Sequence, residues 1–122
     1  QELNKPTTSQ ELALKFKRDQ SRISEILTVL KRLRKIKNFR VRSKDYWIRE
    51  DQDTIIISSI KDNYLKYLKN SEKTTKEISK NFNVTPLSSF KILKKLRDFG
   101  LVTRNENKKW NIKTTRKKVI VI

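Results

Sequence analysis

The 122-residue sequence contains no cysteine, no histidine and no methionine, and its single glycine is Gly100. Without thiols and imidazoles, the chain lacks the side chains that form disulfides, most transition-metal sites and most nucleophile–base pairs. One glycine cannot build the glycine-rich loop that holds a nucleotide phosphate. We therefore expect a protein that is not an enzyme and that holds no metal and no cofactor.

Long apolar runs are missing too. The run Ile55–Ile57 is far shorter than the roughly 20 residues that cross a bilayer, and the amino terminus has no signal-peptide pattern. These features predict a soluble, intracellular protein with no membrane partner. The chain begins at Gln1 rather than at a methionine, which we interpret as processing or as a fragment of a longer protein.

Acidic residues are scarce relative to basic ones. The chain has 31 Lys and Arg against 13 Asp and Glu, a formal net charge of +18, and such a charge is typical of proteins that bind a polyanion. The densest basic run comprises Lys31, Arg32, Arg34, Lys35, Lys37, Arg40, Arg42 and Lys44. Strand alternation would place Phe39 and Val41 on one face and leave Arg40 and Arg42 free for phosphate on the other. The alternative interpretation is a solvated charged face.

One unit occurs twice in the chain, at an offset of 66 residues. The matching residues are Thr8, Glu11, Phe16, Ile26, Leu27 and Leu30, which meet Thr74, Glu77, Phe82, Ile92, Leu93 and Leu96. Two copies make a tandem pair rather than a solenoid. We predict a first unit over residues 1–50 and a second over residues 51–122.

The second copy predicts the order helix, helix, turn, helix, hairpin. We expect a helix over 54–68 begun by Asp51 and Asp53, a short helix ending near Phe82, a helix from Thr85-Pro86 to Gly100, and strands over 101–104 and 109–112. The first copy predicts helices over 9–16 and 20–35 and strands over 36–42 and 46–49. It lacks the leading helix, either because the chain is truncated upstream or because the 54–68 helix serves both units.

The stretch from Thr74 to Val102 resembles the winged helix-turn-helix superfamily, most clearly in its Leu96-x-x-Phe99-Gly100-Leu101-Val102 ending. The first copy is similar from Thr8 to Ile48, with Arg34 and Asn38 near the corner where a helix-ending glycine is usual. The resemblance implies a mainly α fold with small β-hairpin wings (α+β), built as two tandem units of which the first lacks its leading helix. It also implies that the helices from Gln20 and from Thr85 enter the DNA major groove while the hairpins touch the backbone.

Helical geometry then indicates which residues are candidates for contact with DNA. With Ile23, Ile26, Leu27, Leu30 and Leu33 facing inward, Arg22 and Gln20 are candidate base readers. The second helix is suited to phosphate, although it has Ser89 where an apolar residue is commoner and Phe90 where a small polar one is. The nucleic-acid-binding candidates are Arg18, Gln20, Ser21, Arg22, Glu25, Arg32, Arg40, Arg42, Lys44, Thr85, Ser88, Lys91, Lys94, Lys95, Arg104, Lys108 and Lys109.

Several other features have two interpretations. Trp47 and Trp110 are core residues or stack on unpaired bases, and we favour the core. The acids Glu50, Asp51 and Asp53 begin a helix, which we favour, or hold a cation. The apolar tail Val119, Ile120, Val121 and Ile122 pairs with a sheet edge, in this chain or in a protein partner, or closes against the second unit.

Charge and resemblance together predict a module that binds double-stranded DNA, as part of a transcription regulator, a replication initiator or a genome-maintenance protein in the nucleus or nucleoid. One alternative is a protein-interaction scaffold of the transcription-initiation or telomere-capping type, since fold alone does not separate these uses. Binding to structured RNA is a further alternative, and a homodimer is left open.

Overall fold

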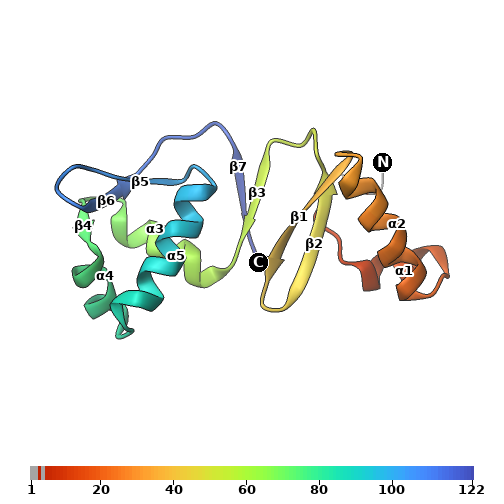
Figure 1. Ribbon diagram of the computed structural model, residues 1–122, viewed down its shortest axis with the longest axis horizontal. Helices are drawn as coiled ribbons and strands as arrows, with labels where there is room; N and C mark the ends of the chain where they lie inside the picture. Colours follow the sequence, from red (N-terminus) through yellow and green to blue (C-terminus); the bar gives the residue numbers. More distant parts are fainter. Residues whose placement is uncertain (1–2, 4) are drawn as a thin grey trace. The chain divides into compact units, whose positions relative to one another are not determined.

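The computed structural model describes Leu3 and residues 5–122 of the chain. It is an α+β protein, and the described residues form five helices and three small sheets (Figure 1). Two compact units are present, Gln1–Ser58 with Lys117–Ile122, and Ser59–Arg116. The predicted division into 1–50 and 51–122 is therefore wrong in two respects. The boundary follows Ser58, and the carboxyl-terminal tail belongs to the first unit because it forms a strand there.

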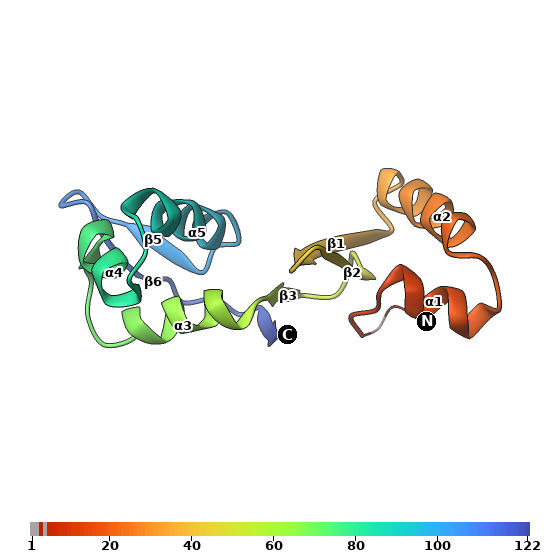
Figure 2. The same ribbon diagram turned by 90° about the horizontal axis from the view of Figure 1, so that it is seen from below.

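The described residues of the first unit form two helices and four strands. The helices are α1 (Ser9–Phe16) and α2 (Gln20–Arg32), and the strands are β1 (Ile36–Val41), β2 (Lys44–Arg49), β3 (Thr54–Ile57) and β7 (Lys118–Val121). β1 and β2 form an antiparallel hairpin that lies between the helices and β3 (Figures 1 and 2). The predicted helices and hairpin are confirmed, with α2 ending three residues early.

Alternation along the hairpin gives it two buried faces. Ile36 and Trp47 are on the face that packs with Leu12, Ile23 and Leu27 of the helices. The opposite face carries Val41 and Ile48, which are also buried. The hairpin is therefore the middle layer of this unit, because both of its faces carry apolar side chains that pack against other elements.

Residues 54–57 form a strand, which corrects the predicted helix over 54–68. β3 pairs in parallel with β7, so that Ile55 lies opposite Val119 and Ile57 opposite Val121. All four residues of β3 are buried, as expected for β-branched residues in a covered strand. The helix begins only at Ser59, so Asp51 and Asp53 precede a strand and do not begin a helix.

The second unit follows the order helix, strand, two helices, hairpin. Its elements are α3 (Ser59–Leu68), β4 (Lys73–Thr74), α4 (Thr75–Phe82), α5 (Pro86–Asp98), β5 (Val102–Arg104) and β6 (Lys109–Ile112). The three strands form one sheet in the order β4-β6-β5, with both pairs antiparallel. The predicted α4, α5 and hairpin are confirmed. α3 belongs to this unit.

The helix pair of each unit has the same local structure. α1 and α4 begin and end at positions 66 apart, and so do α2 and α5. Thr8 with Glu11, and Thr74 with Glu77, form capping boxes in which each threonine hydroxyl accepts from the glutamate N–H at 3.2 Å. The hydrogen bonds from Thr74 lower the pKa of Glu77. Because the cap residues satisfy otherwise unpaired helix N–H groups, the repeat is encoded locally.

Core packing confirms some expectations for buried residues and corrects others. Trp110 is fully buried, and Trp47 packs partly buried against the core of its unit, so both are core residues. Ser89 is also fully buried, and its hydroxyl is 3.0 Å from the Tyr64 hydroxyl. Ile26 and Leu33 are exposed, against the prediction that they face the core.

In the part of the chain that the structure describes, no helix has both the length and the apolar character needed to cross a membrane.

Candidate nucleic-acid interface

The exposed face of α5 carries three lysines. Lys91, Lys94 and Lys95 are all exposed, while Ser89, Leu93 and Leu96 on the other side of the helix are buried. Among the described residues, none of the three lysines has an acidic side chain within ion-pair distance. Like charges at i and i+4 on a helix repel one another. This face is therefore a concentration of uncompensated positive charge, as the sequence predicted.

α3 adds a fourth cation near this face. Burial lowers the pKa of Lys61, and the positive charge of Lys95 lowers it further. The two ammonium groups come from different helices and are close enough to disfavour each other. An anion bound beside them would relieve this repulsion. Sequence reasoning did not single out Lys61, because its approach to Lys95 depends on the packing of α3 against α5.

Two candidate residues at the start of α5, Thr85 and Ser88, are hydrogen-bonded to each other. Thr85 caps the helix by accepting from the Ser88 N–H at 3.2 Å, and its hydroxyl donates to the Ser88 hydroxyl oxygen at 2.9 Å. Both residues are exposed. The two hydroxyls thus stabilise the first turn of the helix, with Pro86 at its first position.

The hairpin of the second unit carries an arginine stacked on aromatic rings. The Arg104 guanidinium lies 5.1 Å from the Trp110 ring centroid and 5.7 Å from that of Phe90. Its Nε atom is buried and has no hydrogen-bond partner among the residues that the structure describes. Stacking fixes the plane of the guanidinium while leaving hydrogen-bond donors unused. Lys108 at the hairpin turn is exposed, and Lys109 beside it is half-buried.

In the first unit, the exposed face of α2 is mixed in charge. Ser21, Arg22, Glu25 and Arg32 are all exposed on it, as helical geometry predicted. Thr28 is exposed as well, and its hydroxyl donates to the Ser24 carbonyl at 2.9 Å. One carboxylate among two arginines gives this face a lower charge density than α5. It therefore has the side chains for reading base edges more than for gripping phosphate.

Gln20 and Lys44 come together beside a polar cleft of about 360 Å³. The cleft lies between the starts of α1 and α2 and the turn of the β1–β2 hairpin, and Ser24 and Thr28 also line it. The Gln20 side-chain amide donates to the Ser9 hydroxyl at 3.2 Å. Gln20 therefore ties α2 to α1, and a role in reading bases would require this bond to open.

The β1–β2 hairpin holds its arginines in intramolecular contacts, which corrects the expectation that they are free for phosphate. Arg40 forms an ion pair with Asp45 at 3.0 Å. Arg42 donates to the Ile122 main-chain carbonyl at 2.8 Å. Arg42 lies in the two-residue hairpin turn with Ser43, both at positive φ, rather than in the strand. The pairing of β7 with β3, which brings Ile122 to this turn, could not be read from the local pattern.

Two further candidates lie elsewhere. Arg18 lines an apolar groove beside α1 and α2, away from the outward face of α2. The acids Glu50, Asp51 and Asp53 do not begin a helix. Asp51 pairs with Arg49. Within the described residues, no three potential metal-ligating side chains gather into a site.

No model of a protein family fits this chain, and no curated protein is significantly similar to it.

Proposed function

We propose that this chain is a tandem winged-helix module that binds double-stranded DNA. The observation that carries the proposal is the exposed face of α5, where Lys91, Lys94 and Lys95 have no acidic partner in the described chain. An uncompensated row of lysines on one helix matches the electrostatic footprint of a phosphate-binding surface.

The order of elements supports the same interpretation. In each unit a short capped helix, a left-handed turn and a 13-residue helix precede an antiparallel hairpin. In the winged-helix arrangement, the second helix of the pair enters the major groove and the hairpin lies beside it. In that arrangement α5 is the main phosphate-gripping helix. α2, with Arg22 and Arg32, is the element that discriminates between bases.

The experiment is binding to a labelled random-sequence duplex at several salt concentrations. Replacing Lys91, Lys94 and Lys95 together by alanine should lower the log–log salt slope by about 0.9 for each phosphate that the variant no longer neutralises. The matched control replaces Lys69, Lys76 and Lys80, three exposed lysines of the same unit outside α5, and removes the same charge. Equal losses of affinity in both variants would show that only net charge matters and would overturn α5 as the interface.

The alternatives are separated by the same assay. A hairpin RNA that competes better than the duplex would indicate an RNA-binding module. The absence of binding at low salt would instead favour a protein-interaction module. Leu87, at 64% exposure on α5, is the apolar residue that such a module would use. The tail Val119–Ile122 is weaker support for a protein partner, because β7 already pairs with β3.

A further inference from the structure

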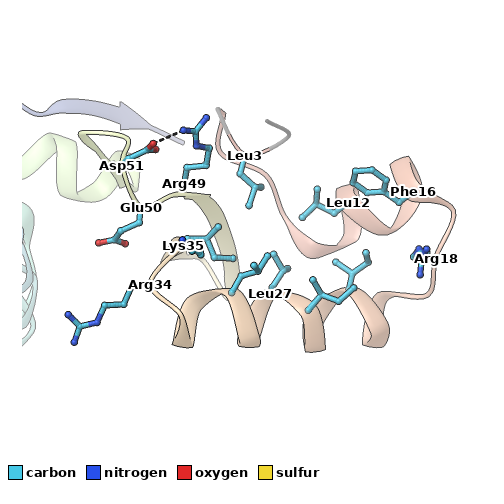
Figure 3. A pocket seen from close by; sticks show the side chains of 14 residues that line it. Leu3, Leu12, Phe16, Arg18, Leu27, Arg34, Lys35, Arg49, Glu50 and Asp51 are labelled. Atoms are coloured by element: carbon cyan, nitrogen blue, oxygen red, sulfur yellow. Dashed lines mark hydrogen bonds and ion pairs between the residues drawn. The ribbon is translucent and has the colours of Figure 1, made fainter.

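An apolar groove runs along α2 in the first unit. Its volume is about 900 Å³, and α1, α2, Leu3 and the ends of the β1–β2 hairpin line it (Figure 3). Phe16 and Ile26, which line the groove, are 46% and 43% exposed. Large apolar side chains gathered at an exposed concave surface mark an interaction site. The groove belongs to neither proposed DNA-contact face.

The second unit shows what packs on the equivalent surface. Phe82 and Ile92 stand at the positions of Phe16 and Ile26, 66 residues later, and both are half-buried rather than exposed. α3 packs on Phe82 there. The Tyr64 ring stacks on Phe82 with ring centroids 4.4 Å apart. The same two positions are thus half-buried in the unit where α3 packs on Phe82, and exposed in the other.

We propose that the groove is the docking site of an amphipathic helix from a partner protein, which packs on α1 and α2 as α3 packs on α4 and α5. At the base of the groove, Leu12, Ile23, Leu27 and Ile36 are already 3–6% exposed. The core of this unit is therefore closed without the helix. A closed base under an open apolar rim is what an exchangeable partner requires, since its departure exposes little of the core.

The rim defines the chemistry of the partner. Arg18 lies at one end of the groove, and Arg34, Lys35 and the acidic Glu50 lie at the other, where the two cations outnumber this acid (Figure 3). Asp51, at the second end, is paired with Arg49. The complementary helix carries large apolar side chains at i and i+4, as Tyr64 and Leu68 do, and acidic residues near both ends. α2 has 13 residues, so a helix of about three turns matches the length of the groove.

The probe is a synthetic peptide of residues 58–70 with the changes K61E and K66E, which keeps the apolar face of α3 and adds acids. Titrated into the full chain and followed by NMR amide signals, it should shift residues of α1 and α2 that line the groove. Phe16→Glu and Ile26→Glu should each weaken binding at least tenfold. The matched control is Leu14→Glu, because Leu14 is 76% exposed on α1 and does not line the groove. All three residues are exposed, and circular dichroism verifies that each variant folds.

Reversing the charge at the rim of the groove is a second test of the proposal. The double substitution Arg34→Glu and Lys35→Glu should weaken binding of the acidic peptide. It should strengthen binding of the peptide that keeps the native lysines. No shift of groove signals at millimolar peptide, or equal weakening by Leu14→Glu, would overturn the proposal. Sedimentation of the chain alone is the third readout. A dimer that Phe16→Glu dissociates would assign the groove to a second copy of this chain, which also overturns it.

Discussion

Arg34 and Gly100 occupy the same position in the two units, 66 residues apart, and both have a left-handed backbone, with φ of 58° and 78°. Each follows a 13-residue helix and turns the chain into the hairpin. Glycine adopts this conformation without strain, whereas the Cβ of an arginine makes it unfavourable. One turn is thus made from two residue types of very different conformational cost.

The first prediction concerns this turn. Arg34→Gly should raise the free energy of unfolding of the first unit by about 1 kcal/mol, and Gly100→Ala should lower that of the second unit by a similar amount. Apart from the two neighbouring residues, no described residue has an atom within 4 Å of a Cβ added at Gly100, so the loss of stability would come from the backbone conformation. Urea unfolding followed by the amide NMR signals of each unit measures both. Destabilisation by Arg34→Gly would contradict the strain argument.

The buried pair Tyr64 and Ser89 provides the second prediction. Ser89→Ala leaves the Tyr64 hydroxyl without its partner in the core, and Tyr64→Phe does the same to Ser89, so each should cost roughly 1–3 kcal/mol of stability. The double variant should lose less than the sum of the two, because neither group is then left unpaired. A double-mutant cycle from urea unfolding gives the coupling. Additive losses would mean that the two hydroxyls do not depend on each other.

The third prediction concerns the tail. Ile120→Ala removes half-buried apolar surface from β7 opposite Ile56, and should lower the stability of the first unit by about 1–2 kcal/mol. Amide exchange of β3 and β7 should rise while that of α5 stays unchanged. Val121→Ala, in the same strand but 44% exposed, is the control with a smaller effect. Loss of protection in the second unit instead would contradict the assignment of the tail to the first.

The pKa of Lys61 leads to the fourth prediction. Burial and the charge of Lys95 lower it below the ordinary value of 10.5. The folded state therefore releases this proton at a lower pH than the unfolded state does. At pH values below the pKa of Lys61 in the folded state, Lys61 is charged and the full cost of its burial lowers the free energy of unfolding. Stability should rise as the pH rises from the folded pKa towards 10.5.

Comparison with Lys61→Gln isolates this contribution, because the other titrating groups are common to both proteins. The stability of the native chain should rise relative to that of the variant as the pH rises through the folded pKa of Lys61. Urea midpoints at a series of pH values between 7 and 10.5 measure it. A difference that does not change with pH would show that Lys61 has an ordinary pKa.

The fifth prediction rests on the proposed function and concerns base reading. Arg22→Ala should relax sequence preference at one position of the selected duplex, at a cost of roughly 1–3 kcal/mol for the preferred base. Lys94→Ala should weaken all duplexes about equally, because phosphate contacts carry no sequence information. Selection from a random library with each variant separates the two effects. Identical selected sequences for the native chain and Arg22→Ala would remove Arg22 as a base reader.

Local sequence determined most of the secondary structure of the helix pairs. The capping boxes at Thr8 and Thr74, the Thr85-Pro86 start and the single glycine each act over a few residues. Their outcome could therefore be predicted without knowledge of distant contacts. The exposed lysines of α5 followed from the same periodicity. The prediction over 54–68 is wrong because three isoleucines at the start of an apolar pattern suit a strand or a helix, and only a pairing partner decides between them.

Tertiary structure decided what depends on contacts between distant residues. The parallel pairing of β3 with β7 brings residues more than 60 positions apart together. Because of this pairing, the tail belongs to the first unit and Arg42 hydrogen-bonds to Ile122. Likewise, Ile26 has the spacing of a core residue, but no described helix covers it, so it lines an open groove. Sequence specifies which side chains could be buried, and the three-dimensional neighbours determine which of them are, because burial is a property of the whole packing and not of one element.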